Sequence, residues 1–281
     1  TRSVAVTGVQ TCALPIFVDG YPAHRIAGKQ FVVQRIREAE RGMVFEKFSS
    51  RENDIVTGII QRMENKNVYI DLGKAEAILT PNEQIPGEIY QYHDRMKTYI
   101  VEVKKTSKGP QIMVSRTHPG LLKRLFELEV PEIHDGLVEI KSVAREPGMR
   151  SKISVYTKDE NIDPVGACVG HKGMRVQTIV NELRGEKIDI VKYSSEPDQY
   201  VANALSPAKV VSTEVLEEEK ICRVIVPDYQ LSLAIGKEGQ NARLAAKLTG
   251  WKIDIKSESQ AAEEAEQGAQ EVGVAYEADE D

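Results

Sequence analysis

Two short loops rich in glycine are the residues of this sequence whose types and spacing most clearly suggest a chemistry. Gly170-His171-Lys172-Gly173 and Gly236-Lys237-Glu238-Gly239 share one pattern, in which two glycines enclose two polar residues. Glycine permits a tight turn and has no Cβ to obstruct a ligand, and the first peptide N–H groups of a helix favour phosphate. Each loop therefore suits contact with a nucleic-acid backbone, although Glu238 places a carboxylate near the proposed phosphate path.

Side chains that follow the loops extend this candidate site. Arg175 and Arg243 are close enough in sequence to add cationic contacts to those of Lys172 and Lys237. A helical corner without a ligand would explain one such loop, but two copies with a lysine in each favour binding. The predicted nucleic-acid-binding residues of this region are Gly170, His171, Lys172, Gly173, Arg175, Gly236, Lys237, Glu238, Gly239, Asn241 and Arg243.

The loops belong to a unit that occurs twice in the chain. In each copy a strand precedes two short helices with the loop between them, and another strand follows. Ser194–Ala208 is interpreted as the linker between the copies. The expected strands are Leu137–Ala144, Lys152–Tyr156, Lys187–Val191, Ile221–Val226 and Lys252–Ile255, and the expected helices are Asp163–Val169, Met174–Leu183, Tyr229–Ile235 and Asn241–Leu248.

A strand-rich region before the repeat offers a second candidate surface. Val68 and Ile70 alternate with Tyr69, so the Tyr69 ring is expected to point outward from a small barrel. Exposed aromatic rings can stack bases, and Tyr69 and His93 are the candidates here, while the neighbouring tyrosines are equally explained as core or rim residues. The expected strands are Asp54–Met63, Val68–Leu72, Ala75–Leu79, Lys97–Lys104 and Gln111–Ser115, followed by a helix at Pro119–Leu128.

The two ends of the chain differ from the region between them. Residues 1–17 show no helical or strand periodicity and are interpreted as a foreign or unstructured segment, and a charged helix is expected at Ala27–Phe48. The formal net charge is −6, and nine acidic residues after position 257 contribute −9, so residues 1–257 carry +3. A mildly basic body tolerates a polyanionic partner, and the acidic end, residues 258–281, is predicted to be disordered.

The composition excludes several classes of protein. A hydrophobic fraction of 41% and a charged fraction of 28% indicate a globular chain, and no apolar stretch is long enough to span a bilayer. Cys12, Cys168 and Cys222 are far apart, which argues against a disulfide framework and a cysteine zinc site. The five histidines are not at ligand spacing, and no catalytic set of side chains is evident. We therefore expect no catalytic residues, no metal, no cofactor and a cytoplasmic location.

These motifs resemble those of a known family. Asp54–Gly58, Val68–Gly73 and Glu76–Pro86 look like parts of an S1 domain, while Pro164–Gln177 and Leu233–Arg243 look like tandem bacterial KH domains. A helix followed by S1, KH and KH domains is similar to the NusA family of bacterial transcription termination/antitermination factors, here amino-terminally truncated. The resemblance covers about Arg25 to Ser257.

The resemblance implies a multidomain α+β fold and a function. It divides the chain into a remnant helix of a polymerase-binding domain (18–50), an S1 domain of the OB-type small barrel (51–117), a first type II KH domain (118–195) and a second one (196–257). It implies a monomeric RNA-binding regulator of pausing, termination and antitermination. The implied partners are single-stranded nascent RNA, RNA polymerase and other transcription factors, with no membrane, and polymerase binding is in question because most of the amino-terminal domain is not represented.

Two other functions remain open at this point. A fragment of an RNA-processing enzyme similar to polynucleotide phosphorylase would also carry S1 and KH modules, but in the order KH then S1 and behind catalytic domains. A ribosome-associated structural protein could use the glycine loops for packing. Nuclease or phosphorolysis activity would favour the enzyme, and unchanged RNA affinity after loop mutation would favour the structural protein.

Overall fold

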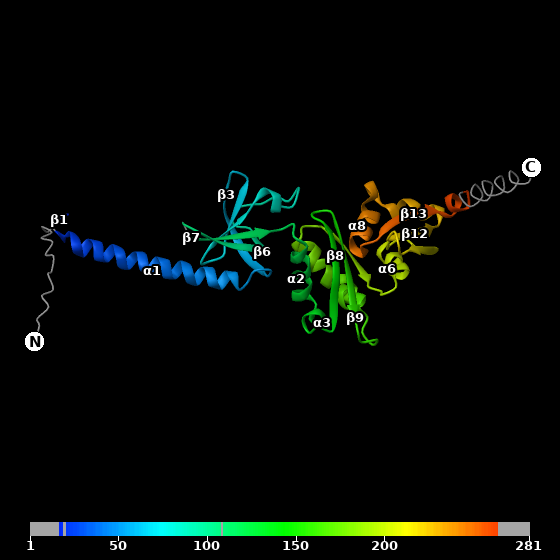
Figure 1. The fold of residues 1–281 in the computed structure, drawn as a ribbon, viewed down its shortest axis with the longest axis horizontal. Helices are drawn as coiled ribbons and strands as arrows, with labels where there is room; N and C mark the ends of the chain where they lie inside the picture. Colours follow the sequence, from blue (N-terminus) through cyan, green and yellow to red (C-terminus); the bar gives the residue numbers. More distant parts are fainter. Residues whose placement is uncertain (1–16, 19–20, 108, 264–281) are drawn as a thin grey trace, which may run out of the picture.

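The structure, a computed structural model, describes residues 17–18, 21–107 and 109–263. The predicted foreign segment up to residue 16 and most of the predicted acidic tail lie outside these residues. Four parts follow one another along the long axis of the molecule: a helix, a barrel and two α+β units (Figure 1). We call the α+β units the first and second repeat units, because they correspond to the two copies identified in the sequence.

The first part is a long helix, α1 (Ala23–Ser49), which follows a short hairpin of β1 (Phe17–Val18) and β2 (Tyr21–Pro22). The helix is longer than the expected Ala27–Phe48. Only its carboxyl-terminal end packs on the barrel, where Phe48 is buried with Val44 and Phe45 beside it. The preceding turns extend away from the barrel (Figure 1), so Phe31 and Ile36 are exposed.

The second part is a closed five-stranded barrel, as the short alternating strands predicted. It contains β3 (Ile55–Glu64), β4 (Asn67–Asp71), β5 (Glu76–Leu79), β6 (Arg95–Thr106) and β7 (Gly109–Ser115) in the order β3-β4-β5-β7-β6, with a 3-10 turn at Pro81–Glu83. Val68 and Ile70 are buried in its core with Ile60 and Ile100. Because side chains alternate along a strand, Tyr69 lies on the outer surface.

The first repeat unit packs helices against a three-stranded sheet. Its helices are α2 (Pro119–Glu129), α3 (Pro131–His134), α4 (Pro164–Val169) and α5 (Met174–Glu182). Its strands are β8 (Val138–Glu146), β9 (Arg150–Thr157) and β10 (Lys187–Lys192), in the order β10-β9-β8 with β10 parallel to β9. The apolar stripe of α2 and Ile179 of α5 supply much of the core, as their helical spacing predicted.

The second repeat unit has the same arrangement of loop helices and parallel strands. It contains α6 (Pro197–Ala204), β11 (Ser212–Leu216), β12 (Ile221–Val226), α7 (Leu231–Ile235), α8 (Gln240–Thr249) and β13 (Lys252–Ser257). Its sheet order is β11-β12-β13, with β13 parallel to β12. A short 3-10 turn at Asp228–Gln230 precedes α7.

Two boundaries near the second repeat unit differ from expectation. The interpretation of Ser194–Ala208 as a linker is wrong, because α6 lies within it and buries Tyr200, Val201 and Ala204 in the core of the unit. The structure also continues as a helix over residues 258–263, where the acidic tail was expected to begin. The Ser259 hydroxyl donates a hydrogen bond of 2.9 Å to Asp228 Oδ2 and connects this helix to the unit.

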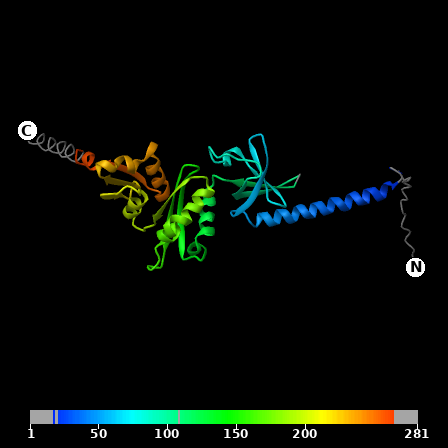
Figure 2. The ribbon, with the colours of Figure 1, turned by 180° about the vertical axis from the view of Figure 1, so that it is seen from behind.

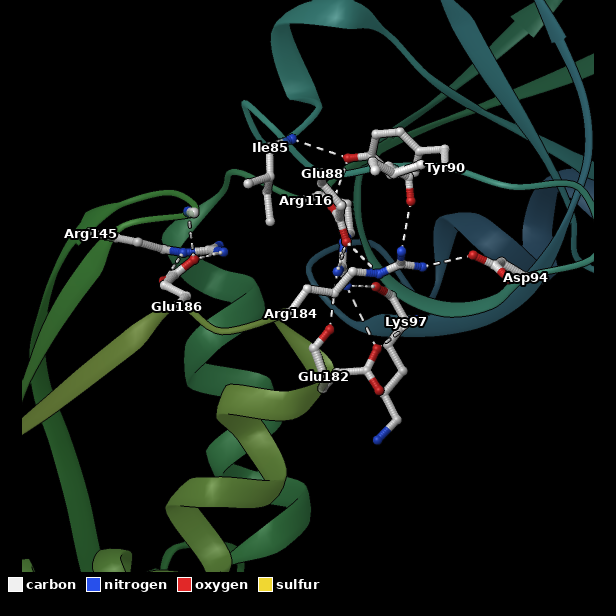
Figure 3. A network of polar contacts seen from close by, with 12 residues as sticks. Ile85, Glu88, Tyr90, Asp94, Lys97, Arg116, Arg145, Glu182, Arg184 and Glu186 are labelled. Carbon is white, nitrogen blue, oxygen red and sulfur yellow. Dashed lines mark hydrogen bonds and ion pairs between the residues drawn. The ribbon is translucent and has the colours of Figure 1, made fainter.

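Buried polar contacts join the barrel to the first repeat unit. The Arg116 side chain is 1% exposed and donates to the Glu88 carboxylate of the barrel and, at 3.1 Å, to the carbonyl of Glu182 in α5. Arg184 donates at 2.8 Å to Asp94, which adds a second connection between the same parts (Figure 3). Apolar contact accompanies these bonds, since Ile55 and Tyr99 of the barrel belong to the core of the first repeat unit.

A second polar interface joins the repeat units to each other. Lys152 of β9 is fully buried, and its Nζ donates to Asp189 at 3.0 Å and to the carbonyl of Ser206 in the second unit at 2.8 Å. Ser142 of β8 donates to the carbonyl of Leu248 in α8 at 2.8 Å. Seen from behind, the barrel and the second repeat unit lie at opposite ends of the first (Figure 2). These contacts join the three parts to one another.

Candidate nucleic-acid interface

The two glycine loops have the same backbone conformation. Gly170, Lys172 and Gly173 have φ values of 72°, 50° and 78°, and Gly236, Glu238 and Gly239 have 77°, 53° and 72°. In each loop the second glycine donates a backbone hydrogen bond to the first, at 3.2 Å in one and 3.1 Å in the other. The repeat found in the sequence is therefore a repeat of backbone geometry.

The two glycines of each loop are required for different reasons. A Cβ on Gly170 would lie 2.6 Å from Arg175 Cγ, and one on Gly236 would lie 2.8 Å from Asn241 Cβ, so the first glycine permits close packing. A Cβ built on Gly173 or Gly239 would instead point into open space. The second glycine thus combines a left-handed φ with open space, and a ligand backbone can approach it.

The loop side chains are exposed and partly cationic. His171, Lys172, Lys237 and Glu238 all extend into solvent. Neither Lys172 nor Lys237 forms an ion pair with any residue that the structure describes. The helices that begin after the loops, α5 and α8, present their unpaired first N–H groups at the same place. Lysine charge and helix N-termini together favour phosphate in both loops, and Glu238 weakens this preference in the second.

Arg175 and Asn241 occupy equivalent positions in the two repeat units. Their side chains form hydrogen bonds that hold the loops in place. Arg175 Nη1 donates at 2.6 Å to the carbonyl of Ala167 and at 2.9 Å to the Glu132 carboxylate. Asn241 is 2% exposed, and its Nδ2 donates at 3.0 Å to the carbonyls of Ala234 and Leu205. The prediction that the Asn241 side chain binds RNA is therefore not supported, because the side chain is buried and holds the end of α7.

Arg243 connects the second loop to the first repeat unit. Its Nε donates at 2.6 Å to Glu146 Oε1, and its Nη1 donates at 3.2 Å to the carbonyl of Glu238 in the loop. The hydrogen bond from Arg243, opposed by partial burial, lowers the pKa of the Glu146 carboxyl. Arg243 was expected to add positive charge for phosphate, but in the structure a carboxylate already partners it, and it positions the loop.

Tyr69 lies on the outer surface of the barrel, as expected, but another side chain stacks on its ring. Arg62, its partner across the β3–β4 pair, places its guanidinium 4.0 Å from the ring centre. Arg62 in turn donates two hydrogen bonds, of 2.9 and 2.8 Å, to the Glu76 carboxylate. The sequence contained a signal for this partner, since the Asn65-Lys66 turn sets a hairpin register that pairs Tyr69 with Arg62.

His93 and the remaining aromatic side chains are not gathered beside Tyr69. His93 is exposed in a turn before β6, with a φ of 68°, and its backbone N–H donates to the carbonyl of Ile60. Tyr99 is buried and stacks on His118, with ring centres 4.6 Å apart. The Tyr90 hydroxyl donates to Glu88, and burial raises the pKa of that hydroxyl. Tyr90 and Tyr99 are therefore parts of the domain interface.

The fold brings together two clusters of basic residues from separate parts of the chain. One lines a cavity of about 580 Å³ between α1 and the barrel and includes Arg37, Arg41 and Lys74 beside Tyr69. The other lines a cavity of about 550 Å³ at the junction of the repeat units, with Lys192 and Lys209. Both depend on parts that are distant in sequence, so residue spacing alone gave no signal for them.

The described residues show no sign of metal chemistry or of a membrane segment. No group of three His, Cys, Asp or Glu side chains in the described part of the chain is arranged to hold a metal ion. Cys168 and Cys222 are buried and free, and burial raises the pKa of both thiols. Among the helices that the structure describes, none has both the length and the apolar composition needed to cross a bilayer.

Family comparisons agree with the three folded parts. The S1 RNA binding domain family matches residues 49–115, the NusA-like first KH domain family matches residues 116–193, and the NusA-like second KH domain family matches residues 197–263. The last two matches begin and end close to the boundaries of the two repeat units. We now call these units the first and second KH domains.

Whole-protein comparisons extend the similarity to proteins named transcription termination/antitermination protein NusA. The chain is 71% identical to the protein from Halalkalibacterium halodurans and 70% identical to that from Bacillus subtilis, over 84% of this chain and 62% and 63% of those proteins. It is 50% identical to the protein from Mycobacterium tuberculosis, over 82% of this chain and 69% of that protein. The chain thus spans about three fifths of the length of the first two relatives.

Proposed function

The chain belongs to the NusA family of transcription termination/antitermination proteins, and on this premise we propose that it is an RNA-binding transcription elongation factor. It binds single-stranded nascent RNA, contacts RNA polymerase, and modulates pausing, termination and antitermination. The RNA-processing enzyme and the ribosomal structural protein have no comparable support, because the matched KH families are those of NusA and follow the S1 domain.

One observation carries this proposal: two glycine loops of the same backbone conformation, each with an exposed lysine that has no ion-pair partner among the described residues. Loops of this kind in KH domains clamp about four backbone nucleotides. A single loop would bind weakly. Since the two KH domains are joined by buried contacts, binding at one loop raises the effective RNA concentration at the other.

The proposal assigns different tasks to the loop residues. Lys172 and Lys237 contact phosphates, together with the first N–H groups of α5 and α8. Arg175 and Arg243 are positioning residues, because carboxylates and loop carbonyls already occupy their guanidinium groups. Gly173 and Gly239 leave the space in which the RNA backbone approaches.

The function can be tested by single-round transcription with purified bacterial RNA polymerase across a pause site and an intrinsic terminator. We expect the chain to change the pause lifetime or the fraction of terminated transcripts, and we expect Lys172→Asp/Lys237→Asp to lose this effect. A matched control is Lys158→Asp/Lys220→Asp, which changes one exposed lysine outside the loop in each KH domain. Equal effects of both variants, or no effect of the unaltered chain, would contradict the proposal.

A further inference from the structure

The two glycine loops differ at one position in a way that phosphate binding does not explain. Lys172 in the first loop and Glu238 in the second occupy the same place between the two glycines, with φ values of 50° and 53°. Both side chains are exposed to solvent. The backbone conformation is therefore repeated at this position, whereas the charge of the side chain is reversed.

An additional side-chain contact holds this position in the second loop. Arg243 of α8 donates at 3.2 Å to the carbonyl of Glu238 and at 2.6 Å to the Glu146 carboxylate of the first KH domain. The equivalent residue of α5 is Gln177, whose side chain instead donates at 2.9 Å to Asn181 on its own helix. The backbone of Glu238 is thus held by an arginine that is itself anchored in the neighbouring domain.

The Glu238 carboxylate is left available to a ligand. The Arg243 guanidinium donates to the carbonyl of Glu238 and to Glu146, and no other donor or cation of the described residues contacts the Glu238 carboxylate. The open space beside Gly239 lets a ligand backbone approach the loop. Because an ionised carboxylate only accepts hydrogen bonds, the ligand group that it binds must be a donor.

The backbone of a nucleic acid restricts the choice of that donor. Loops of this kind contact the backbone of the bound strand. Phosphate oxygens accept hydrogen bonds and are repelled by a carboxylate, and the ring oxygen of the sugar is also an acceptor. The 2′-hydroxyl of ribose is the one backbone group that can donate a hydrogen bond, and DNA lacks it. A charged acceptor makes such a hydrogen bond shorter and stronger than one between neutral groups.

We propose that Glu238 accepts a hydrogen bond from a ribose 2′-hydroxyl and thereby makes the second KH domain selective for RNA over DNA. Lys172, at the same position of the first loop, binds phosphate whichever sugar carries it. The inference rests on the proposed RNA binding at the glycine loops and gives the two loops different tasks. Amino and imino groups of the bases also donate, but they lie away from the backbone that the loop contacts.

The test compares two oligonucleotides of one sequence, single-stranded RNA and its 2′-fluoro analogue, which lacks the hydroxyl donor but keeps the sugar conformation of RNA. Fluorescence anisotropy gives the ratio of the two affinities, in a buffer with EDTA so that no divalent cation bridges carboxylate and phosphate. Glu238→Lys should lower this ratio about tenfold, as expected for one hydrogen bond to a charged group. Lysine suits the backbone at this position, because Lys172 has the same φ. The variant should also bind the fluoro analogue more tightly, since the repulsion of phosphate is removed.

Two further variants separate the hydrogen bond from a general effect of charge. Glu219→Lys makes the same charge change at an exposed residue of the second KH domain outside the loop, and should leave the ratio unchanged. Glu238→Gln keeps an acceptor oxygen without the charge and should give an intermediate ratio.

Three outcomes would overturn the inference. An unchanged ratio in Glu238→Lys, or an equal fall in Glu219→Lys, would do so while leaving RNA binding at the loops intact. If Glu238→Lys alters the preference among bases and not the ratio between sugars, the carboxylate contacts a base and the inference is wrong. An unaltered chain that binds neither oligonucleotide would contradict the proposed function together with the inference.

Discussion

Arg243 of the second KH domain donates a hydrogen bond of 2.6 Å to Glu146 of the first. The same carboxylate accepts a bond of 2.8 Å from the side chain of Gln240, the first residue of α8. Arg243 also holds the carbonyl of Glu238 within the second glycine loop. One carboxylate at the end of β8 therefore links the first KH domain to the second glycine loop.

Glu146→Gln should loosen this loop without unfolding either domain. The variant keeps the size of the side chain but removes the charge, and because Arg243 is partly exposed we expect only a small loss of stability. We expect faster hydrogen exchange of the Gly236–Gly239 amides and about threefold weaker RNA binding. Glu139→Gln, on the same strand and paired with Lys141 on the surface, is the matched control. Unchanged loop exchange in Glu146→Gln would show that the contact does not position the loop.

Removing the Arg116 side chain should destabilise the junction of the S1 and KH domains. Arg116→Ala leaves the buried Glu88 carboxylate without its main partner and removes hydrogen bonds to the carbonyls of Lys97 and Glu182. Breaking a buried pair in this way costs about 3–5 kcal/mol. Denaturant unfolding measures the loss, and small-angle scattering should show a wider range of domain arrangements. Arg95→Ala, which removes an exposed arginine of the same barrel, should change neither measurement; an equal change in both variants would contradict this role of Arg116.

Acid should weaken the first KH domain through Glu186. Burial opposes ionisation of this side chain, but hydrogen bonds from Arg145, Ser151 and Gly148 outweigh it and lower the pKa. A lowered carboxyl pKa contributes stability that is present above the unfolded value, about 4.5, and is lost as the pH falls through the folded value. The stability difference between the unaltered chain and Glu186→Gln should therefore shrink as the pH falls below about 4.5. A difference that is constant from neutral pH to acid would rule this out.

The buried thiols should not react with thiol reagents while the protein is folded. Burial raises the pKa of Cys168 to about 12 and also raises that of Cys222, so neither forms a reactive thiolate near neutral pH. In a Cys12→Ser chain, a thiol reagent should label neither residue in native buffer and both in denaturant. Rapid labelling of the native chain would mean that at least one KH core opens more readily than its packing implies.

Local patterns were sufficient to predict most elements and the candidate loops. Val68 and Ile70 are buried and Tyr69 lies outside because the alternation of a strand is a local property. The glycine loops were likewise predictable, since their left-handed positions require glycine wherever the two helices meet. The helix at Pro197–Ala204 was missed because polar residues precede it and a proline is its first residue, although Tyr200, Val201 and Ala204 form its buried side.

The roles of the charged residues could not be obtained from the sequence. Glu146 and Arg243 are 97 positions apart, and only the packing of one KH domain on the other brings them together. Arg116 looks like a surface residue in sequence and is buried because barrel and KH domain enclose it. Asn241 follows the second loop as a polar residue would in a binding site, yet it satisfies carbonyls inside the domain. Such roles depend on three-dimensional neighbours, whereas composition and periodicity report local structure.

RNA binding at the glycine loops is tested most directly by fluorescence anisotropy, which compares the affinity of a short single-stranded RNA for the unaltered chain and for Lys172→Asp/Lys237→Asp. Lys158→Asp/Lys220→Asp is the control, because it has the same charge and because Lys220, like Lys172, has a left-handed φ that aspartate tolerates. We expect the loop variant to lose about tenfold or more in affinity and to show a smaller salt slope, with little change for the control and an unaltered circular dichroism spectrum for both. Equal affinities of the two folded variants would contradict RNA binding at the glycine loops.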